Sequence, residues 1–111
     1  MDCLFCKIVS REIPADIVFE NDACLAFGDM NPQAPTHILI VPKKHVDSMA
    51  SATSADDLQS LLLAASEVAR QEGIDRAGYR VVINSGQQAG QTVLHLHVHL
   101  LGGRAMAWPP G

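Results

Sequence analysis

The amino-acid sequence predicts an α+β fold with an antiparallel sheet of about five strands, one long helix and a short N-terminal helix. Three observations lead to this prediction. Residues 94–101, LHLHVHLL, alternate between apolar residues and histidine, which is typical of a half-buried strand. Residues 54–73 instead repeat apolar side chains at helical spacing. Several short β-rich runs complete the sheet.

The N-terminal third predicts a short helix followed by a hairpin. CLFCKIVSREIP is expected to form a short helical turn that Pro14 closes. β-rich runs at residues 17–20 and 24–27 flank the turn-prone pair Asn21–Asp22, which predicts a hairpin. Cys24 lies in the second run and is expected to be a core residue.

The next strand and the long helix follow an irregular loop, MNPQAP. THILIVP, residues 36–42, predicts a continuous buried strand that Pro42 ends. The long helix is expected to begin near Ser54, where Asp57 three residues later resembles a capping box, and to stop at Gly73. One helix face is apolar, and its residues are Leu58, Leu61, Leu62, Ala65, Val68 and Ala69.

YRVVINSG, residues 79–86, predicts a further strand, and the histidine segment predicts the last one. Strand alternation directs Leu96, Val98 and Leu100 to the core and His95, His97 and His99 to the opposite face, roughly 7 Å apart at each step. A solvated histidine-rich face is one interpretation. Metal ligation and acid–base or nucleophilic catalysis are the two others, because imidazole binds metals, carries protons near neutral pH and attacks phosphorus.

Composition narrows the class of protein. The 111 residues predict one domain, 1–111, and the 48% hydrophobic and 18% charged residues are typical of a compact soluble protein. A net charge of −4 at pH 7 argues against nucleic acid as a partner. The sequence shows no export signal and no membrane-spanning run, and its three cysteines are odd in number. We therefore expect no membrane partner and a cytoplasmic location.

The loop that precedes the histidines, NSGQQAGQT at residues 84–92, contains two glycines that permit positive φ. Such loops direct several N–H groups toward one anion. An ordinary hairpin loop is the alternative. Because Gly90, Gln91 and Thr92 lead directly into the histidines, a phosphate held there would lie beside an imidazole.

Cys3 and Cys6 form a C-x2-C pair, the usual first half of a structural zinc site. The remaining ligands could come from His37, His45 and one histidine of the triplet. A redox pair and two packed core cysteines are the alternatives. A catalytic zinc on the triplet itself is geometrically feasible, but it would occupy the imidazoles that nucleophilic chemistry needs.

Several separated motifs together resemble the histidine-triad (HIT) family, in particular its Hint branch. They are HLHVHLLGG, the upstream APTHILIVPKKH and the ending GGRAMAWPPG. The resemblance runs through nearly the whole chain as a single HIT domain and is weakest in residues 50–73. It implies a HIT-like fold whose two copies pair into one continuous sheet, and therefore a homodimer. Trp108 resembles a residue that reaches the partner's active site; packing of this tail on its own domain is the alternative.

The resemblance also implies an activity. Hint-type enzymes hydrolyse purine nucleoside 5′-phosphoramidates, and some act on aminoacyl-adenylates, through a nucleotidyl-histidine. The matching nucleophile is His97, His99 would contact the α-phosphate, and His37 would support the cluster. Thr92 takes the position of a serine that assists the amine leaving group. Hydrolysis of dinucleoside polyphosphates, and a zinc-stabilised nucleotide-binding regulator without turnover, are the competing functions.

The same resemblance assigns the binding residues for an AMP- or GMP-type substrate. Asp29 matches the residue that binds the ribose hydroxyls, with Met30 beside it. Gly28 stands where larger residues are common. The residues that match the base wall and the phosphate and sugar contacts are Phe5, Ile8, Ile13, Phe27, Asn84, Gly90 and Gln91. The implied ligands of a structural zinc are Cys3, Cys6, His45 and His95, with no organic cofactor.

Overall fold

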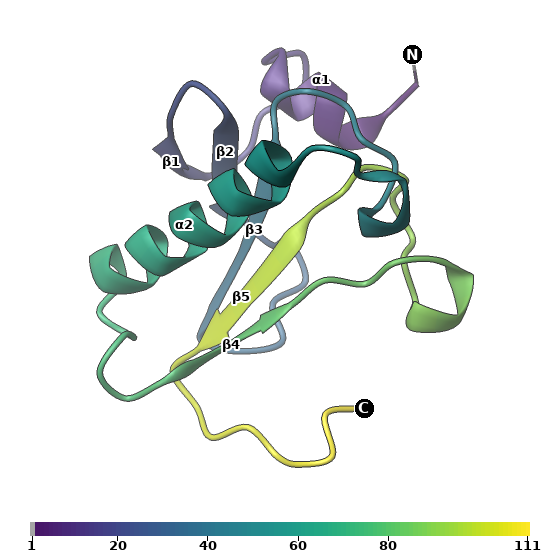
Figure 1. Ribbon diagram of the computed structural model, residues 1–111. Helices are drawn as coiled ribbons and strands as arrows, with labels where there is room; N and C mark the ends of the chain where they lie inside the picture. The colour runs from purple at the N-terminus through teal and green to yellow at the C-terminus, as the bar shows by residue number, and fades with distance from the viewer. Residues whose placement is uncertain (1) are drawn as a thin grey trace.

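The computed structural model describes residues 2–111, and within them it contains one five-stranded antiparallel sheet and two α-helices (Figure 1). The strand order is β1-β2-β3-β5-β4. The predicted fold class is confirmed. The elements, in chain order, are α1 (Leu4–Val9), β1 (Ile17–Glu20), β2 (Cys24–Gly28), β3 (Thr36–Pro42), α2 (Ala55–Gln71), β4 (Tyr79–Val82) and β5 (Val98–Gly102), with short 3-10 turns at Met49–Ser51 and Gln87–Ala89.

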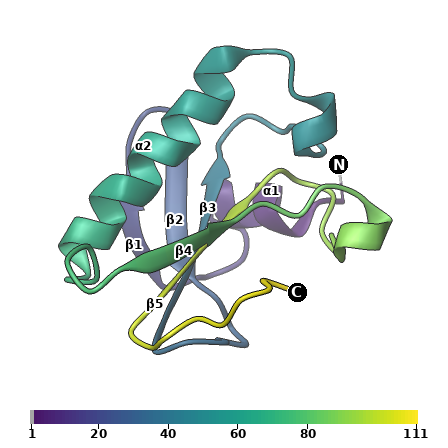
Figure 2. The same ribbon diagram turned by 60° about the horizontal axis from the view of Figure 1, so that its bottom comes forward.

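The two faces of the sheet pack against different helices. Helix α2 lies across one face (Figures 1 and 2), where Ala26, Ile40 and Leu100 belong to its core cluster. The alternate residues Phe27 and Leu39 pack with α1 on the other face. Because side chains alternate along each strand, β2 and β3 each contribute residues to the core on both faces of the sheet. The histidines lie on the α1 side.

The predicted hairpin is confirmed, with β1 and β2 antiparallel. Its turn is held by the Asn21 side chain, whose Oδ1 accepts the N–H groups of Ala23 at 2.9 Å and Cys24 at 2.7 Å. Asparagine favours turns because it makes such local hydrogen bonds. Cys24 is completely buried, as predicted for a core residue.

Helix α2 begins and ends where the sequence predicts, but its capping differs. Ser54 is the N-cap residue and makes no side-chain capping hydrogen bond. Asp57 instead pairs with Lys44 at 3.3 Å, so the predicted capping box is wrong. At the other end Gly73 has φ +74°, the left-handed conformation that favours glycine. The part of the chain that the structure describes has no helix suited in length and apolarity to crossing a membrane.

The regular strand β5 is shorter than the histidine segment. It starts at Val98, so His95 and His97 precede it and only His99 lies within it. The N–H of Leu96 donates to the Val46 carbonyl at 2.6 Å instead of joining a ladder. Pro42, at the facing end of β3, has no N–H to offer. The predicted alternation nevertheless holds, because Leu96 packs in the α2 core.

Two other boundaries also differ from prediction. Helix α1 ends at Val9, where Ser10 is the C-cap and Arg11 adopts a left-handed φ of 68°, so the helix stops well before Pro14. Strand β4 ends at Val82, opposite His99, because the chain then leaves the sheet toward the glycine loop.

Candidate functional site

A cavity of about 530 Å³ lies on the α1 side of the sheet. Its wall is mainly apolar, and His97, His99, Asp29 and Thr92 supply polar groups. The full set of lining residues is Leu4, Phe5, Ile8, Ile13, Pro14, Ala15, Asp16, Phe27, Gly28, Asp29, Met30, Leu39, Thr92, Val93, His97 and His99. Such a cavity, apolar with a few convergent polar groups, is typical of a small-molecule site.

The cavity brings together most of the predicted substrate-binding residues. Those that line it are Phe5, Ile8, Ile13, Phe27, Asp29, Met30, Thr92, His97 and His99, whereas Asn84, Gly90, Gln91 and Trp108 do not. The lining residues that the sequence did not predict are Leu4, Pro14, Ala15, Asp16, Leu39 and Val93. Leu39 could have been inferred, since it pairs with Phe27 across adjacent strands. The segment 14–16 carries no comparable signal.

His97 is buried, and its backbone surroundings fix its tautomer. Its Nδ1 lies 2.7 Å from the His95 carbonyl oxygen, which can only accept, so Nδ1 carries the proton. The neutral ring therefore has its lone pair on Nε2. The ring packs edge-on against Phe5, with centroids 5.1 Å apart. Nε2 of His97 is thus the group available for nucleophilic attack or for accepting a proton.

His37 fixes the tautomer of His99 in turn. The N–H of Gln33 donates to His37 Nδ1 at 3.0 Å, so His37 carries its proton on Nε2. That Nε2–H donates to His99 Nδ1 at 2.9 Å, and Asp29 Oδ2 lies 3.3 Å from it as a second acceptor. His99 consequently carries its proton on Nε2. Its N–H is then a donor for an anion in the cavity.

Burial, together with the smaller effects of the neighbouring His97 and His37, lowers the pKa of His99 to about 4. His99 is therefore neutral near pH 7. Asp29, His37 and His99 also bring potential metal-ligand atoms within 4.8 Å of one another. Because hydrogen bonds already engage both nitrogens of His37, this cluster is better suited to orienting His99 than to binding a metal.

The low pKa of His99 predicts a loss of stability in acid. Between its ordinary value of 6.5 and about 4, the unfolded chain binds a proton at this side chain that the folded chain does not. The free energy of unfolding should therefore fall by about 3 kcal/mol as pH drops through this window. In His99→Asn the amide oxygen still accepts from His37 but does not titrate. Denaturant unfolding between pH 7 and 4, at constant zinc, should give a shallower slope for this variant; equal slopes would contradict the assignment.

The four predicted zinc ligands also lie together. Ligand atoms of Cys3, Cys6, His45 and His95 all lie within 4.8 Å of one another. Cys3 Sγ is 3.4 Å and Cys6 Sγ 3.6 Å from His95 Nδ1, Cys6 Sγ is 3.3 Å from His45 Nδ1, and the two Nδ1 atoms are 3.2 Å apart. Around a tetrahedral zinc, neighbouring nitrogen and sulfur ligands are about 3.3–3.8 Å apart. The donor set fits zinc in both type and spacing.

Hydrogen bonds from Nε2 orient both imidazoles so that their Nδ1 atoms can bind a metal. The Nε2–H of His95 donates to the Pro42 carbonyl at 2.9 Å, and that of His45 donates to Asp47 Oδ1 at 2.7 Å. Each Nδ1 is left with a lone pair directed at the thiols. Such second-shell acceptors are typical of metal-binding histidines. Burial lowers the pKa of His95 and raises that of the Cys6 thiol, so a dication would compensate for the desolvation of this cluster.

The glycine loop differs from a simple phosphate cradle. Gly86 and Gly90 have φ of 92° and 84°, as expected of glycine. The N–H groups of Gly90 and Gln91 donate within the loop, to Gln87 and Gly86. The Gln91 side chain also holds the loop, since it donates to the carbonyls of Asp47 and Val93. Within residues 2–111, the N–H of Thr92 donates to no other protein group. It therefore remains available to a ligand.

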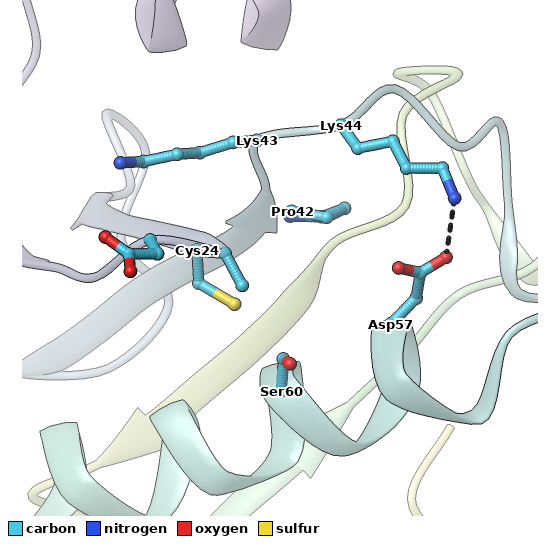
Figure 3. A pocket seen from close by; sticks show the side chains of 8 residues that line it. Cys24, Pro42, Lys43, Lys44, Asp57 and Ser60 are labelled. Carbon is cyan, nitrogen blue, oxygen red and sulfur yellow. Dashed lines mark hydrogen bonds and ion pairs between the residues drawn. The ribbon is translucent and has the colours of Figure 1, made fainter.

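A smaller cavity, of about 130 Å³, lies between α2 and the ends of β2 and β3 (Figure 3). It is lined by Cys24, Lys43, Lys44 and Asp57, among others. Lys44 is paired with Asp57 at 3.3 Å, and Lys43 with Glu20 at 2.7 Å. Since both cations are already neutralised, this cavity is a weaker candidate for binding an anionic substrate.

Trp108 lies outside the histidine cavity and is 81% exposed. The Arg80 guanidinium lies 5.9 Å from its ring centre, and Arg80 also donates to the Ala107 carbonyl. The C-terminal tail is therefore attached to β4, while the indole stays accessible. Its predicted contact with a partner's site remains a prediction.

Comparison with known proteins places the chain in a family. The HIT domain family matches residues 10–106. A 14 kDa zinc-binding protein of Zea mays is 52% identical, covering 97% of this chain and 87% of that protein. The crystal structure of a HIT family hydrolase from Legionella pneumophila has a TM-score of 0.96 at 50% identity, over 99% of this chain and 100% of that one. A histidine triad nucleotide-binding protein from Candida albicans has a TM-score of 0.85 at 32% identity, over 97% and 83%. The chain therefore belongs to the HIT family.

Proposed function

We propose that this protein is a hydrolase of the Hint branch that cleaves the P–N bond of purine nucleoside 5′-phosphoramidates. The observation that carries the proposal is the pairing of two imidazoles with complementary hydrogen-bonding groups in one largely apolar cavity. His97 offers a free Nε2 lone pair, and His99 offers an Nε2–H. One ring is thus prepared to attack and the other to stabilise charge. Similarity to a protein named as a hydrolase and to one named as nucleotide-binding supports this function.

The cavity supports one orientation of a nucleotide. The base packs against the apolar wall formed by Phe5, Ile8, Ile13 and Phe27. The Asp29 carboxylate, directly after β2, accepts the ribose hydroxyls. The α-phosphate then lies at the histidine end, where the Thr92 N–H is free to donate. A developing negative charge on the phosphoryl oxygens would meet donors already in place, which is the main source of electrostatic catalysis.

The proposed reaction has two steps. His97 Nε2 attacks the α-phosphorus, and the Nε2–P bond forms as the P–N bond breaks. The amine leaves with a proton taken from solvent, which Thr92 helps to position, and the water of the second step returns one proton to solvent. Water then attacks phosphorus and breaks the Nε2–P bond. The products are a nucleoside 5′-monophosphate and the amine. The His95 carbonyl keeps the His97 proton on Nδ1 throughout, so Nε2 is regenerated as a nucleophile.

The remaining assignments concern zinc and assembly. Cys3, Cys6, His45 and His95 would hold a structural zinc, which leaves His97 and His99 free for the reaction. We further propose a homodimer whose sheet continues across the interface. Within the described chain β4 pairs on one side only, with β5, so its other edge is open. In such a dimer Trp108 would approach the partner's active site.

A substrate panel tests this function. Adenosine and guanosine 5′-phosphoramidates with different amines should be hydrolysed with kcat/KM at least about tenfold above that for a diadenosine polyphosphate. The P–N substrates should be favoured because the amine leaves as a small neutral group. Faster cleavage of the polyphosphate would instead assign the protein to a different reaction, and no hydrolysis by zinc-loaded protein would indicate a binding protein.

A further inference from the structure

We propose that Arg104 is a positioning residue for the reaction, because it holds the loop whose Gln33 N–H fixes the tautomers of His37 and His99. This inference deepens the proposed function and rests on it. Arg104 is exposed, follows the end of β5 in the C-terminal tail and does not line the histidine cavity. Its effect on the reaction therefore passes through other residues.

The loop between β2 and β3 has little main-chain support at residues 30–35. Pro32 and Pro35 have no N–H to donate. Within the described chain, 2–111, no residue of this loop segment takes part in a backbone–backbone hydrogen bond. The position of the loop consequently depends on hydrogen bonds that involve side chains.

Most of these hydrogen bonds lie within residues 29–37. The Asn31 N–H donates to Asp29 Oδ1 at 2.8 Å, and the Gln33 side chain donates to the Asn31 carbonyl at 3.0 Å. The Gln33 N–H donates to His37 Nδ1, also at 3.0 Å. Such local bonds shape the loop but do not attach it to the rest of the molecule.

Arg104 supplies that attachment. Its Nε–H donates to the Gln33 carbonyl at 3.0 Å. Among residues 2–111, this is the only hydrogen bond that joins residues 30–35 to a segment outside 29–37. Arg104 thus holds the same residue whose N–H faces His37.

The sheet explains why Arg104 reaches this loop. Strands β3 and β5 pair antiparallel, so the start of β3 lies beside the end of β5. Gly103 has φ +87°, and a Cβ there would lie 2.9 Å from Pro35 Cβ, so glycine permits the close approach of the two segments. Arg104 Nη1 also donates to the Ala105 carbonyl at 3.0 Å, which orients the guanidinium.

Displacement of the Gln33 N–H would affect His99 through His37. The present arrangement puts the His37 proton on Nε2, which donates to His99 Nδ1 at 2.9 Å and leaves His99 an Nε2–H for the phosphate. Without the Gln33 N–H, the reverse arrangement gains population, in which His99 donates from Nδ1 to His37 Nε2. The His99 Nε2 lone pair would then face the phosphoryl oxygens unfavourably. Asp29 still favours the present arrangement, so the effect is partial.

Attraction of the anionic substrate by charge is the other role open to Arg104. The two roles predict different kinetics. A positive charge outside the cavity would act on binding and therefore on KM, and salt would screen it. A hydrogen bond that orients the His99 donor acts where negative charge develops, and therefore on kcat.

Two variants of the zinc-loaded, full-length protein separate these roles. Arg104→Met keeps an apolar stem and removes every donor. Arg104→Gln removes the charge but keeps an N–H donor, because Gln Nε2 and Arg Nε are the same number of bonds from the main chain. Kinetics on a nucleoside phosphoramidate give kcat and KM. Nitrogen NMR spectra of protein labelled at the histidine rings report the His99 tautomer without substrate.

Arg104→Met should lower kcat by about fivefold to tenfold, the scale of one hydrogen bond, with KM nearly unchanged. Its His99 signals should shift from those of a single tautomer, with the proton on Nε2, toward an average of two. Arg104→Gln should recover most of kcat and the wild-type His99 signals. Arg76→Met is the matched control, because it makes the same change at an exposed position outside the cavity, and it should match the wild type.

Wild-type kcat and His99 signals in Arg104→Met would overturn the inference, and so would an equal rise of KM in both variants with kcat unchanged. Either result would leave the proposed function intact, since wild type would still hydrolyse the phosphoramidate. Conversely, an Arg104-dependent change in the His99 signals in a protein that hydrolyses no phosphoramidate would support the positioning role and contradict the proposed activity.

Discussion

His97→Ala should lower kcat for a nucleoside phosphoramidate by at least about 10⁴-fold, the scale expected when the nucleophile of a covalent mechanism is removed. Binding of the product nucleotide should change little, because Asp29 and the apolar wall remain. The reason lies in the tautomer: the His95 carbonyl leaves Nε2 as the free lone pair at the cavity end. Single-turnover kinetics and calorimetric binding measure the two effects separately.

A second variant tests whether the loss of activity in His97→Ala has a purely structural cause. His97 is 7% exposed and packs against Phe5, so alanine leaves a void. His97→Gln fills more of this space and keeps a polar group, yet it has no nucleophilic nitrogen. It should be as inactive as His97→Ala and more stable. Turnover of either variant near the wild-type rate would contradict the role of His97.

Removal of the metal should cause the second large effect, on stability. The Cys3→Ser/Cys6→Ser variant should lose its zinc and about 3–4 kcal/mol of unfolding free energy, the stabilisation expected when free zinc is 100–1,000 times its Kd. The physical cause is the partly buried cluster of thiols and imidazoles, which lacks its compensating cation without the metal. Metal analysis should find about one zinc per wild-type chain, and denaturant unfolding measures the stability.

The control for this prediction is a chelator. It should destabilise the wild type to about the level of the double variant and leave the variant itself unaffected. A chelator-treated wild type without zinc and with unchanged stability would show that the four side chains do not hold a structural metal.

Regular patterns allowed most of the fold to be predicted. Alternation in residues 95–100 placed Leu96, Val98 and Leu100 in the α2 core, and helical spacing located α2. The strand boundaries near the site were harder to predict from the sequence. The start of β5 at Val98 depends on a hydrogen bond from Leu96 to the distant Val46, which no local pattern reveals.

The candidate site was predicted in part for a similar reason. The C-x2-C spacing indicated a metal, but spacing alone left several histidines open as its partners. The tertiary fold brings His45 and His95 to the cysteines, as the family resemblance implied. The glycine loop was expected to offer several amides, whereas two of them are used within the loop.

The most direct test of the central claim is to trap the covalent intermediate. Wild-type protein is mixed with a nucleoside phosphoramidate, quenched within one turnover under alkaline denaturing conditions that preserve phosphohistidine, and mapped by tandem mass spectrometry. We expect one nucleoside monophosphoryl group, attached to His97 and absent from His97→Gln. A nucleotide attached to another side chain, or a complete single turnover that never labels His97, would contradict the mechanism.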